Sequence, residues 1–259
     1  MITQVNTPRQ RQRFLNACRG KLCMDATLPL ALQLLGKAQP GRFFAGPTLA
    51  LDVGGRTAMA AGHANPEELA SFLGFCGCHA VILDGAECPA PTGWQKACDH
   101  TIFGLAAGEQ LPLPAQTEAQ KALWERLTFV EEPASGPVAQ VLFPDRPARR
   151  DDFYSELCTK RSRGKALVWT LEQGGEIVCT VGAYALCNGQ AYMACGQTAE
   201  ALRGQRIGGR LIVQMANTLS AQGYQPVFLC SPERVHFYTQ LGFHPLGTLA
   251  RYESPIGKD

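Results

Sequence analysis

The sequence predicts a mixed α/β fold, with a mostly antiparallel sheet flanked by helices, in two successive parts. Three observations support this class. Short apolar runs alternate with amphipathic segments along the 259 residues, as strands and helices would. Glycine pairs at residues 54–55 and 174–175 each separate two apolar runs, which is the pattern of a β-hairpin. A glycine-rich basic stretch at residues 203–210 separates an apolar run from an amphipathic one, which indicates a strand, a loop and a helix.

Two helices and a hairpin are expected first. Thr7 and Thr27 are candidate helix starts, and each has a proline within the first turn that would follow it. Residues 48–53 and 57–61 are apolar runs on either side of the glycine pair, so they predict the two strands of the hairpin.

A helix and two buried strands complete the N-terminal part. Asn65 is a candidate cap, Pro66 fits the first helical position, and two glutamates in the next positions complement the helix dipole. Residues 80–83 and 101–105 are short apolar runs that predict strands.

Two proline-rich segments predict linkers, at residues 111–114 and 131–137. Between them, Thr117 with Gln120 forms the pattern of a capping box and predicts a helix. We place the domain boundary near Pro133, which gives an N-terminal domain of residues 1–133 and a C-terminal domain of residues 134–259.

The C-terminal domain alternates strands and helices. Its expected elements are a strand at 138–143, a helix at 149–160, a hairpin of residues 166–171 and 176–181, a strand at 191–195, a helix with its apolar face at 211–219, a strand at 226–230, a helix from Ser231 to Gly242, and two short strands at 246–252.

The composition is that of an ordinary globular protein, with 46% hydrophobic and 18% charged residues. The formal net charge of +2 gives no reason to expect a nucleic acid or an anionic membrane as partner. No apolar run approaches the ~20 residues that a membrane span needs, and the first residues lack the apolar core of a signal peptide. We therefore expect a cytoplasmic protein.

Eleven cysteines lie at irregular spacing, many of them inside apolar runs, where a free cysteine acts as a small hydrophobic residue. One group of side chains could instead be zinc ligands: Cys76, Cys78, His79, Cys88, Cys98 and His100. Structural zinc sites use repeated ligand pairs, whereas strand alternation would separate the first two thiols. We expect reduced thiols and no metal.

The loop at residues 203–210 has the chemistry of an anion site. Gly208 and Gly209 let the backbone approach an anion without a Cβ in the way. The first N–H groups of the following helix have no partners within the helix, and its dipole adds positive charge. Arg203, Arg206 and Arg210 add more. The loop predicts a diphosphate cradle, although strand-to-helix turns are also rich in glycine for purely geometric reasons.

Arg203, with Gly208-Gly209 after it and the segment from His236 to Phe243 beyond the next strand, resembles the GNAT superfamily of acyl-CoA-dependent N-acetyltransferases. In that family a (Gln/Arg)-x-x-Gly-x-(Gly/Ala) loop holds the CoA pyrophosphate, and a Tyr-x-x-Leu-Gly-Phe segment closes the thiol end. This sequence departs from the motif at Arg206, where the family more often has glycine. The resemblance extends from near Val138 to the C-terminus.

The resemblance implies an acetyl-CoA-binding domain that acetylates the primary amine of a small molecule or peptide. The cofactor-binding residues it implies are Cys195, Gly196, Gln197, Thr198, Arg203, Gly204, Gln205, Arg206, Ile207, Gly208, Gly209, Arg210 and Ser231. The pantetheine arm would lie where the strands at Cys195–Thr198 and Leu229–Cys230 splay apart. Tyr238 would be the general acid or the hydrogen-bond donor at the sulfur.

The general base is not evident, because residues 191–198 carry no carboxylate. Other acids and a histidine lie nearby in the sequence: Glu172, Glu176, Glu200 and His236. A missing base would also fit a non-catalytic acyl-CoA binding or sensing protein. A nucleotide-binding βαβ unit is a further alternative, but residues 219–226 lack the acidic residue that binds ribose.

The order hairpin, helix, strand occurs in both halves, with residues 65–68 of the N-terminal half standing where the C-terminal half has its glycine loop. Acidic residues there could not hold a phosphate. The N-terminal half is thus expected to be a degenerate GNAT-like copy that builds a wall or a homodimer surface. A chance α/β arrangement is the alternative.

Overall fold

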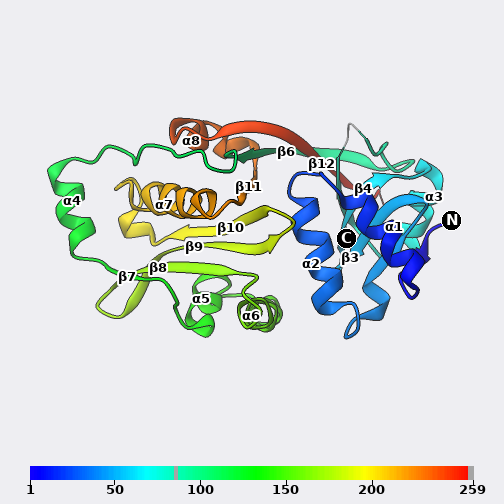
Figure 1. Ribbon diagram of the computed structural model, residues 1–259, viewed down its shortest axis with the longest axis horizontal. Helices are drawn as coiled ribbons and strands as arrows, with labels where there is room; N and C mark the ends of the chain where they lie inside the picture. Colours follow the sequence, from blue (N-terminus) through cyan, green and yellow to red (C-terminus); the bar gives the residue numbers. More distant parts are fainter. Residues whose placement is uncertain (85–86, 256–259) are drawn as a thin grey trace. The chain divides into compact units, whose positions relative to one another are not determined.

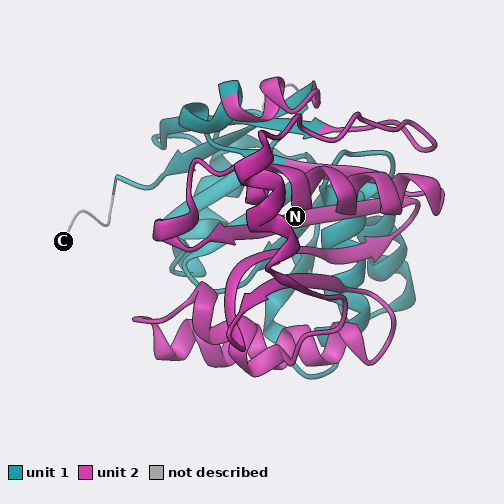
Figure 2. Ribbon diagram, turned by 90° about the vertical axis from the view of Figure 1, so that its left-hand side faces the viewer, with its two compact units in different colours: residues 1–103, 229–236, 245–259 teal, residues 104–228, 237–244 magenta. Residues whose placement is uncertain are grey.

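The computed structural model describes residues 1–84 and 87–255. The chain divides into two compact units (Figure 2). Unit 1 contains Met1–Phe103, Leu229–His236 and Pro245–Asp259, and unit 2 contains Gly104–Phe228 and Phe237–His244. The boundary near Pro133, as the place where the two halves of the sequence meet, stays a prediction.

Unit 1 begins with a short strand and two helices and continues into a sheet (Figure 1). Its elements are β1 (Thr3–Gln4), α1 (Pro8–Cys18), α2 (Met24–Leu35), the 3₁₀ turn Pro40–Arg42, β2 (Phe43–Ala45), β3 (Thr48–Val53), β4 (Thr57–His63), α3 (Pro66–Phe75), β5 (Ala80–Leu83), β6 (Gln95–Gly104) and β12 (His244–Glu253).

The helix starts of unit 1 follow the local sequence with one exception. The Thr7 side chain and Gln10 form a capping box at α1, as a helix start at Thr7-Pro8 predicts. The start predicted at Thr27 is wrong, because α2 begins at Met24 and keeps Pro29 inside it. Proline removes only one intrahelical bond there, while the residues around it are buried, so burial of the apolar face outweighs the loss.

The sheet of unit 1 is antiparallel from β1 through β4 and parallel between β4 and β5, where α3 makes the crossover. The last strand of the chain, β12, pairs antiparallel with β5, with Ala250 opposite Leu83. The prediction of two short strands closing the C-terminal domain is therefore wrong. A single long strand closes unit 1 instead, because it buries Leu249 and Ala250 and covers the edge of β5.

Unit 2 follows the same plan. Its elements are α4 (Glu118–Glu125), β7 (Thr128–Val130), α5 (Ser135–Leu142), α6 (Pro147–Arg161), β8 (Leu167–Gln173), β9 (Glu176–Cys187), β10 (Gln190–Thr198), the 3₁₀ turn Glu200–Leu202, α7 (Ile207–Ala221) and β11 (Gln225–Cys230), the last two residues of which belong to unit 1. The 3₁₀ turn Pro232–Arg234 that follows lies in unit 1, and α8 (Val235–Gln240) begins in unit 1 and ends in unit 2. In Figure 1, α7 covers one face of β8–β10, and α5 and α6 cover the other.

Two local predictions for unit 2 need correction. The segment predicted as a strand at 138–143 belongs to helix α5, which buries Val138 and Ala139. A short apolar run of this kind has no period that separates strand from helix, so packing decides. The short strand β7 was not expected. The helix capped by Thr117 and Gln120 is present as predicted.

Both units share one order of strands and helices, βααβββαβ, and one pattern of pairing. In unit 2, β7 through β10 are antiparallel neighbours and β10 pairs parallel with β11, as β1 through β5 do in unit 1. The predicted class, a mixed α/β fold with a mostly antiparallel sheet and a second half of similar build, is confirmed. Repetition of both order and pairing disfavours a chance arrangement.

Candidate active site

The strands β10 and β11 part soon after they begin. Their parallel pairing covers three residues, Gln190 to Tyr192 of β10 against Gln225 to Val227 of β11. Beyond Tyr192, β10 has no pairing with β11 within the described residues, and Cys195, Gly196 and Gln197 are exposed. An open strand edge of this kind presents backbone N–H and C=O groups to a ligand.

A bulge lies in β10 at the same place. Ala194 faces Gly182 of β9 and Gln197 faces Thr180, so that Cys195 and Gly196 together oppose a single residue. Cys195 takes a left-handed conformation, with φ of 53°. Bulges bend a strand and re-aim its groups, and they are common beside active sites. The predicted pantetheine-binding residues Cys195–Thr198 thus form the open, bulged end of β10.

The loop after β10 leads directly into an uncapped helix. Arg206 is the N-cap of α7 in the left-handed conformation, with φ of 60°, and in the described chain no side chain caps the helix. The first N–H groups of α7, from Ile207 to Gly209, therefore lack the partner that a cap would supply. Arg206 thus adopts the conformation that glycine, the residue more common at this position of the family motif, adopts at no cost.

The two glycines of α7 also have a packing role. A Cβ at Gly208 would lie 2.6 Å from the Thr198 Oγ1 of β10, and a Cβ at Gly209 would lie 3.0 Å from the Leu241 Cδ2 beyond α8. Close packing of the first helical turn therefore favours glycine at both positions. This packing accounts for the geometric explanation of the glycine-rich loop, and anion binding by the loop stays a prediction.

The three arginines of the loop make protein contacts. The Arg203 Nε donates to the Thr198 carbonyl at 3.2 Å. The Arg206 Nη1 donates to the Ala115 carbonyl at 2.7 Å. The Arg210 guanidinium donates to the Gln116 Oε1 at 2.9 Å and stacks 4.8 Å from the centre of the Trp124 ring. Arg206 and Arg210 thus hold the segment that leads into α4 against the start of α7.

This segment continues along α7. Asn217 exchanges hydrogen bonds with the backbone of Leu111, at 2.9 and 2.8 Å, and the Ser220 hydroxyl donates to the Ala106 carbonyl at 3.0 Å. Sequence reasoning missed Gln116 and Trp124 as neighbours of the loop. They lie far from it along the chain, and nothing in their local pattern marks them.

Tyr238 lies on α8, half-buried in an aromatic cluster. Its ring centre is 4.5 Å from that of Phe228 and 5.0 Å from that of Phe237. These neighbours fix the position of the ring. Ser231 caps a 3₁₀ turn and donates its hydroxyl to the Glu233 carboxylate, and this bond lowers the pKa of Glu233. Although Ser231 lies at the N-cap position of this turn, its side chain makes no capping hydrogen bond to the backbone of the described chain.

The three glutamates and the histidine considered as the general base show no contact among the described residues that would mark a catalytic base. Glu176 and Glu200 are exposed, as is His236. Glu172 is half-buried and accepts a hydrogen bond from Thr170 at 3.4 Å. None of these contacts marks one of them as the base.

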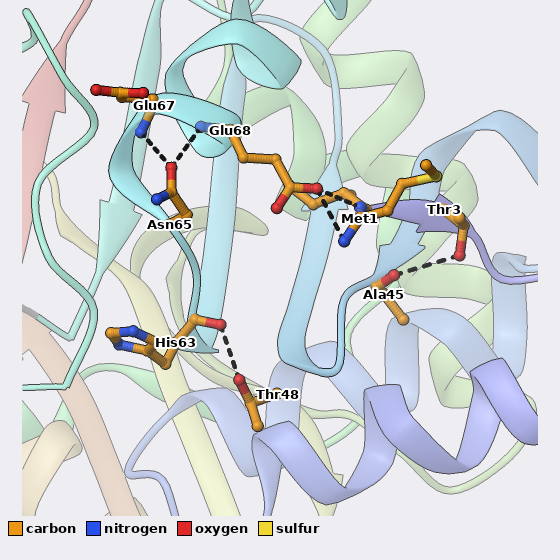
Figure 3. Close-up of polar contacts among 9 residues, drawn as sticks. Met1, Thr3, Ala45, Thr48, His63, Asn65, Glu67 and Glu68 are labelled. Carbon is orange, nitrogen blue, oxygen red and sulfur yellow. Dashed lines mark hydrogen bonds and ion pairs between the residues drawn. The ribbon is translucent and has the colours of Figure 1, made fainter.

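At the corresponding helix start in unit 1, the backbone N–H groups have hydrogen-bond partners and the side chains are acidic (Figure 3). The Asn65 Oδ1 accepts from the N–H groups of Glu67 and Glu68, at 2.9 and 3.0 Å. The Glu68 carboxylate in turn accepts from the Ile2 N–H at 2.7 Å and pairs with the N-terminal ammonium of Met1 at 3.1 Å. The start of α3 thus offers neither open N–H groups nor glycine, unlike the start of α7.

Within residues 1–84 and 87–255, no cluster of three or more His, Cys, Asp or Glu side chains has metal-binding geometry. None of the eleven cysteines, which all lie in these ranges, forms a disulfide. Burial raises the pKa of Cys78 and of Cys88 to about 11, so both thiols stay protonated at neutral pH. The described part of the chain also has no helix long and apolar enough to cross a membrane.

Purified protein should therefore contain no bound zinc, because protonated thiols and scattered histidines make poor ligands. Elemental analysis checks this. Stoichiometric zinc that disappears in the Cys76→Ser, Cys78→Ser double variant would contradict the packing role given to these cysteines.

The family comparison places an acetyltransferase (GNAT) domain at residues 164–245, from the start of β8 to the start of β12. A search of curated protein sequences finds no match.

Among solved structures, the GCN5-related N-acetyltransferase from Sphaerobacter thermophilus is 14% identical, with a TM-score of 0.62 over 97% of this chain and 94% of that one. A tandem GNAT protein from the clavulanic acid biosynthesis pathway is 12% identical, with a TM-score of 0.61 over 100% of this chain and 99% of that one. The GCN5-related N-acetyltransferase from Kribbella flavida is 16% identical, with a TM-score of 0.58 over 88% and 94%. These likenesses show the fold, and the tandem protein matches both units.

Proposed function

We propose that this protein, whose residues 164–245 form a GNAT acetyltransferase domain, is an acetyl-CoA-dependent N-acetyltransferase acting on the primary amine of a small molecule or peptide. The observation that carries the proposal is the start of α7. It is uncapped, contains Gly208 and Gly209, and follows the open end of β10 after the loop of residues 199–206. A helix start of this kind binds phosphate oxygens through its free N–H groups and its dipole.

Each part of the site would hold one part of the cosubstrate. The N–H groups of residues 204–209 would bind the pyrophosphate, with the charge of Arg203, Arg206 and Arg210 nearby. The open edge at Cys195–Thr198 would bind the pantetheine arm by backbone hydrogen bonds. Acetyl-CoA supplies an activated acetyl group.

The chain's own residues would then orient the acetyl group and handle the protons. Backbone N–H groups at the β10 bulge would stabilise negative charge on the thioester oxygen. Tyr238 would donate its phenolic proton or a hydrogen bond at the sulfur. The amine's own proton would pass to water, because no carboxylate lies on residues 191–198.

Unit 1 would serve as a wall or as a surface for a homodimer, without CoA of its own. Glu67 and Glu68 at the start of α3 would repel phosphate, and Asn65 already occupies their N–H groups. We propose the cytoplasm as the location.

The protein should bind a single acetyl-CoA per chain, and titration calorimetry measures this stoichiometry. A crystal structure with a second CoA against α3 would contradict the assignment of unit 1. A panel of amines, with thiol release as the readout, then tests catalysis. Tight binding without turnover of any amine would favour the acyl-CoA binding or sensing protein instead.

A further inference from the structure

Tyr184 of β9 occupies a bulge of its own. Ala185 faces Tyr192 of β10 and Ala183 faces Met193, so Tyr184 stands between them without a partner residue. Such a residue leaves the regular alternation of the strand, and its side chain is re-aimed.

The glycine two residues before it makes room for the re-aimed ring. A Cβ at Gly182 would lie 2.5 Å from the Tyr184 Cζ and 2.7 Å from its hydroxyl oxygen. The ring therefore lies back along β9 over Gly182. Gly182 faces Ala194 across the sheet, the residue that comes directly before the β10 bulge at Cys195. The phenol thus lies beside the place where the proposed function puts the thioester.

The surroundings of the ring are apolar. Tyr184 packs with Val138, Leu157 and Val168, and its ring centre is 5.4 Å from that of Phe153. The residue is 7% exposed. Its hydroxyl is buried and has no hydrogen-bond partner among the described residues. A buried hydroxyl without a partner destabilises the folded state, and a ligand that accepts its proton in a hydrogen bond would remove that cost.

The hydroxyl can act only as a neutral group. Burial, together with the nearby Cys195 thiol, raises the pKa of Tyr184 well above the usual value for tyrosine. The phenol keeps its proton across the physiological range and has that proton to donate. A neutral donor in apolar surroundings suits a carbonyl oxygen rather than a charged group.

We propose that the Tyr184 hydroxyl is a hydrogen-bond donor to the carbonyl oxygen of the acetyl group, a second stabilising group beside the β10 backbone. This inference rests on the proposed function, because it takes acetyl-CoA as the ligand. Charge grows on that oxygen as the amine attacks, so the bond strengthens in the transition state.

The test compares CoA with acetyl-CoA in the Tyr184→Phe variant, which keeps the ring over Gly182 and removes only the hydroxyl. Titration calorimetry should show that CoA binds as in the wild type, while the wild-type preference for acetyl-CoA, several-fold for one hydrogen bond, is lost. Thiol release from acetyl-CoA should slow by about a hundredfold or more. The melting temperature should hold or rise, because a buried donor without a partner is gone.

Tyr154→Phe is the matched control, since Tyr154 lies on α6, 47% exposed, and loses the same hydroxyl. An unchanged ratio of CoA to acetyl-CoA affinity and an unchanged rate in Tyr184→Phe, with a raised melting temperature, would overturn the inference and leave the ring as packing over Gly182. Wild-type protein that binds neither CoA nor acetyl-CoA would instead overturn the proposed function.

Discussion

Replacing Gly208 by aspartate should abolish acetyl-CoA binding. The new Cβ would lie 2.6 Å from the Thr198 Oγ1, so either the Thr198 side chain or the first turn of α7 would have to shift. The carboxylate would stand at a helix start that is to receive phosphate, and it would repel that anion. We expect the affinity to fall by more than about 100-fold, or about 2.7 kcal/mol. Titration calorimetry with acetyl-CoA measures the change.

Two further variants separate the causes. Gly208→Ala adds the Cβ without the charge, so it reports the steric part alone. Gly41→Asp adds the same charge in unit 1 at a glycine whose Cβ meets nothing within 4 Å, and it should leave binding unchanged. If Gly208→Asp binds acetyl-CoA like the wild type, with an unchanged melting temperature, the phosphate does not lie at the start of α7.

The sequence predicted correctly those helices and hairpins whose ends depend on residues close together in the chain. The caps at Thr7, Asn65 and Thr117 each make the hydrogen bonds that their sequence indicates. Such bonds form within one turn of helix, so they depend little on the rest of the fold. The hairpin of β8 and β9 is equally local, because its turn is a glycine pair with left-handed conformations.

Predictions failed where distant packing decides the structure. The segment of α5 is apolar and short, and burial of Val138 against the sheet makes it helical. The last strand pairs with β5, far earlier in the sequence, and no residue near β12 indicates which edge it joins. Long-range pairing of this kind leaves no local pattern.

The residues of the candidate site also divide into those that the sequence predicts and those that only the fold brings together. The loop from Arg203 to Arg210 was predictable, because glycine, charge and the strand-to-helix order lie together in the sequence. Gln116 and Trp124 were not, since they reach Arg210 only through the fold. The bulges that place Cys195 and Tyr184 arise from the register of two strands, which single residues do not reveal.

Replacing Tyr238 by phenylalanine should slow catalysis and leave CoA binding nearly unchanged. Phenylalanine keeps the ring against Phe228 and Phe237 and removes only the hydroxyl. Most of the proposed binding lies in the α7 loop and the β10 edge, which this change does not touch. If the hydroxyl supplies or stabilises the proton of the departing thiolate, the maximal rate should fall by about tenfold or more, or roughly 1.4 kcal/mol of transition-state stabilisation.

Steady-state kinetics with an amine found in the panel, together with calorimetry for CoA, separates the possible roles of Tyr238. Tyr224→Phe is the control, because Tyr224 is half-buried in unit 2 and lies outside the proposed site. Weaker CoA binding with an unchanged maximal rate would make Tyr238 a residue that binds the ground state. An unchanged rate and an unchanged affinity would make it a packing residue of the aromatic cluster, and the leaving thiolate would then take its proton from another group.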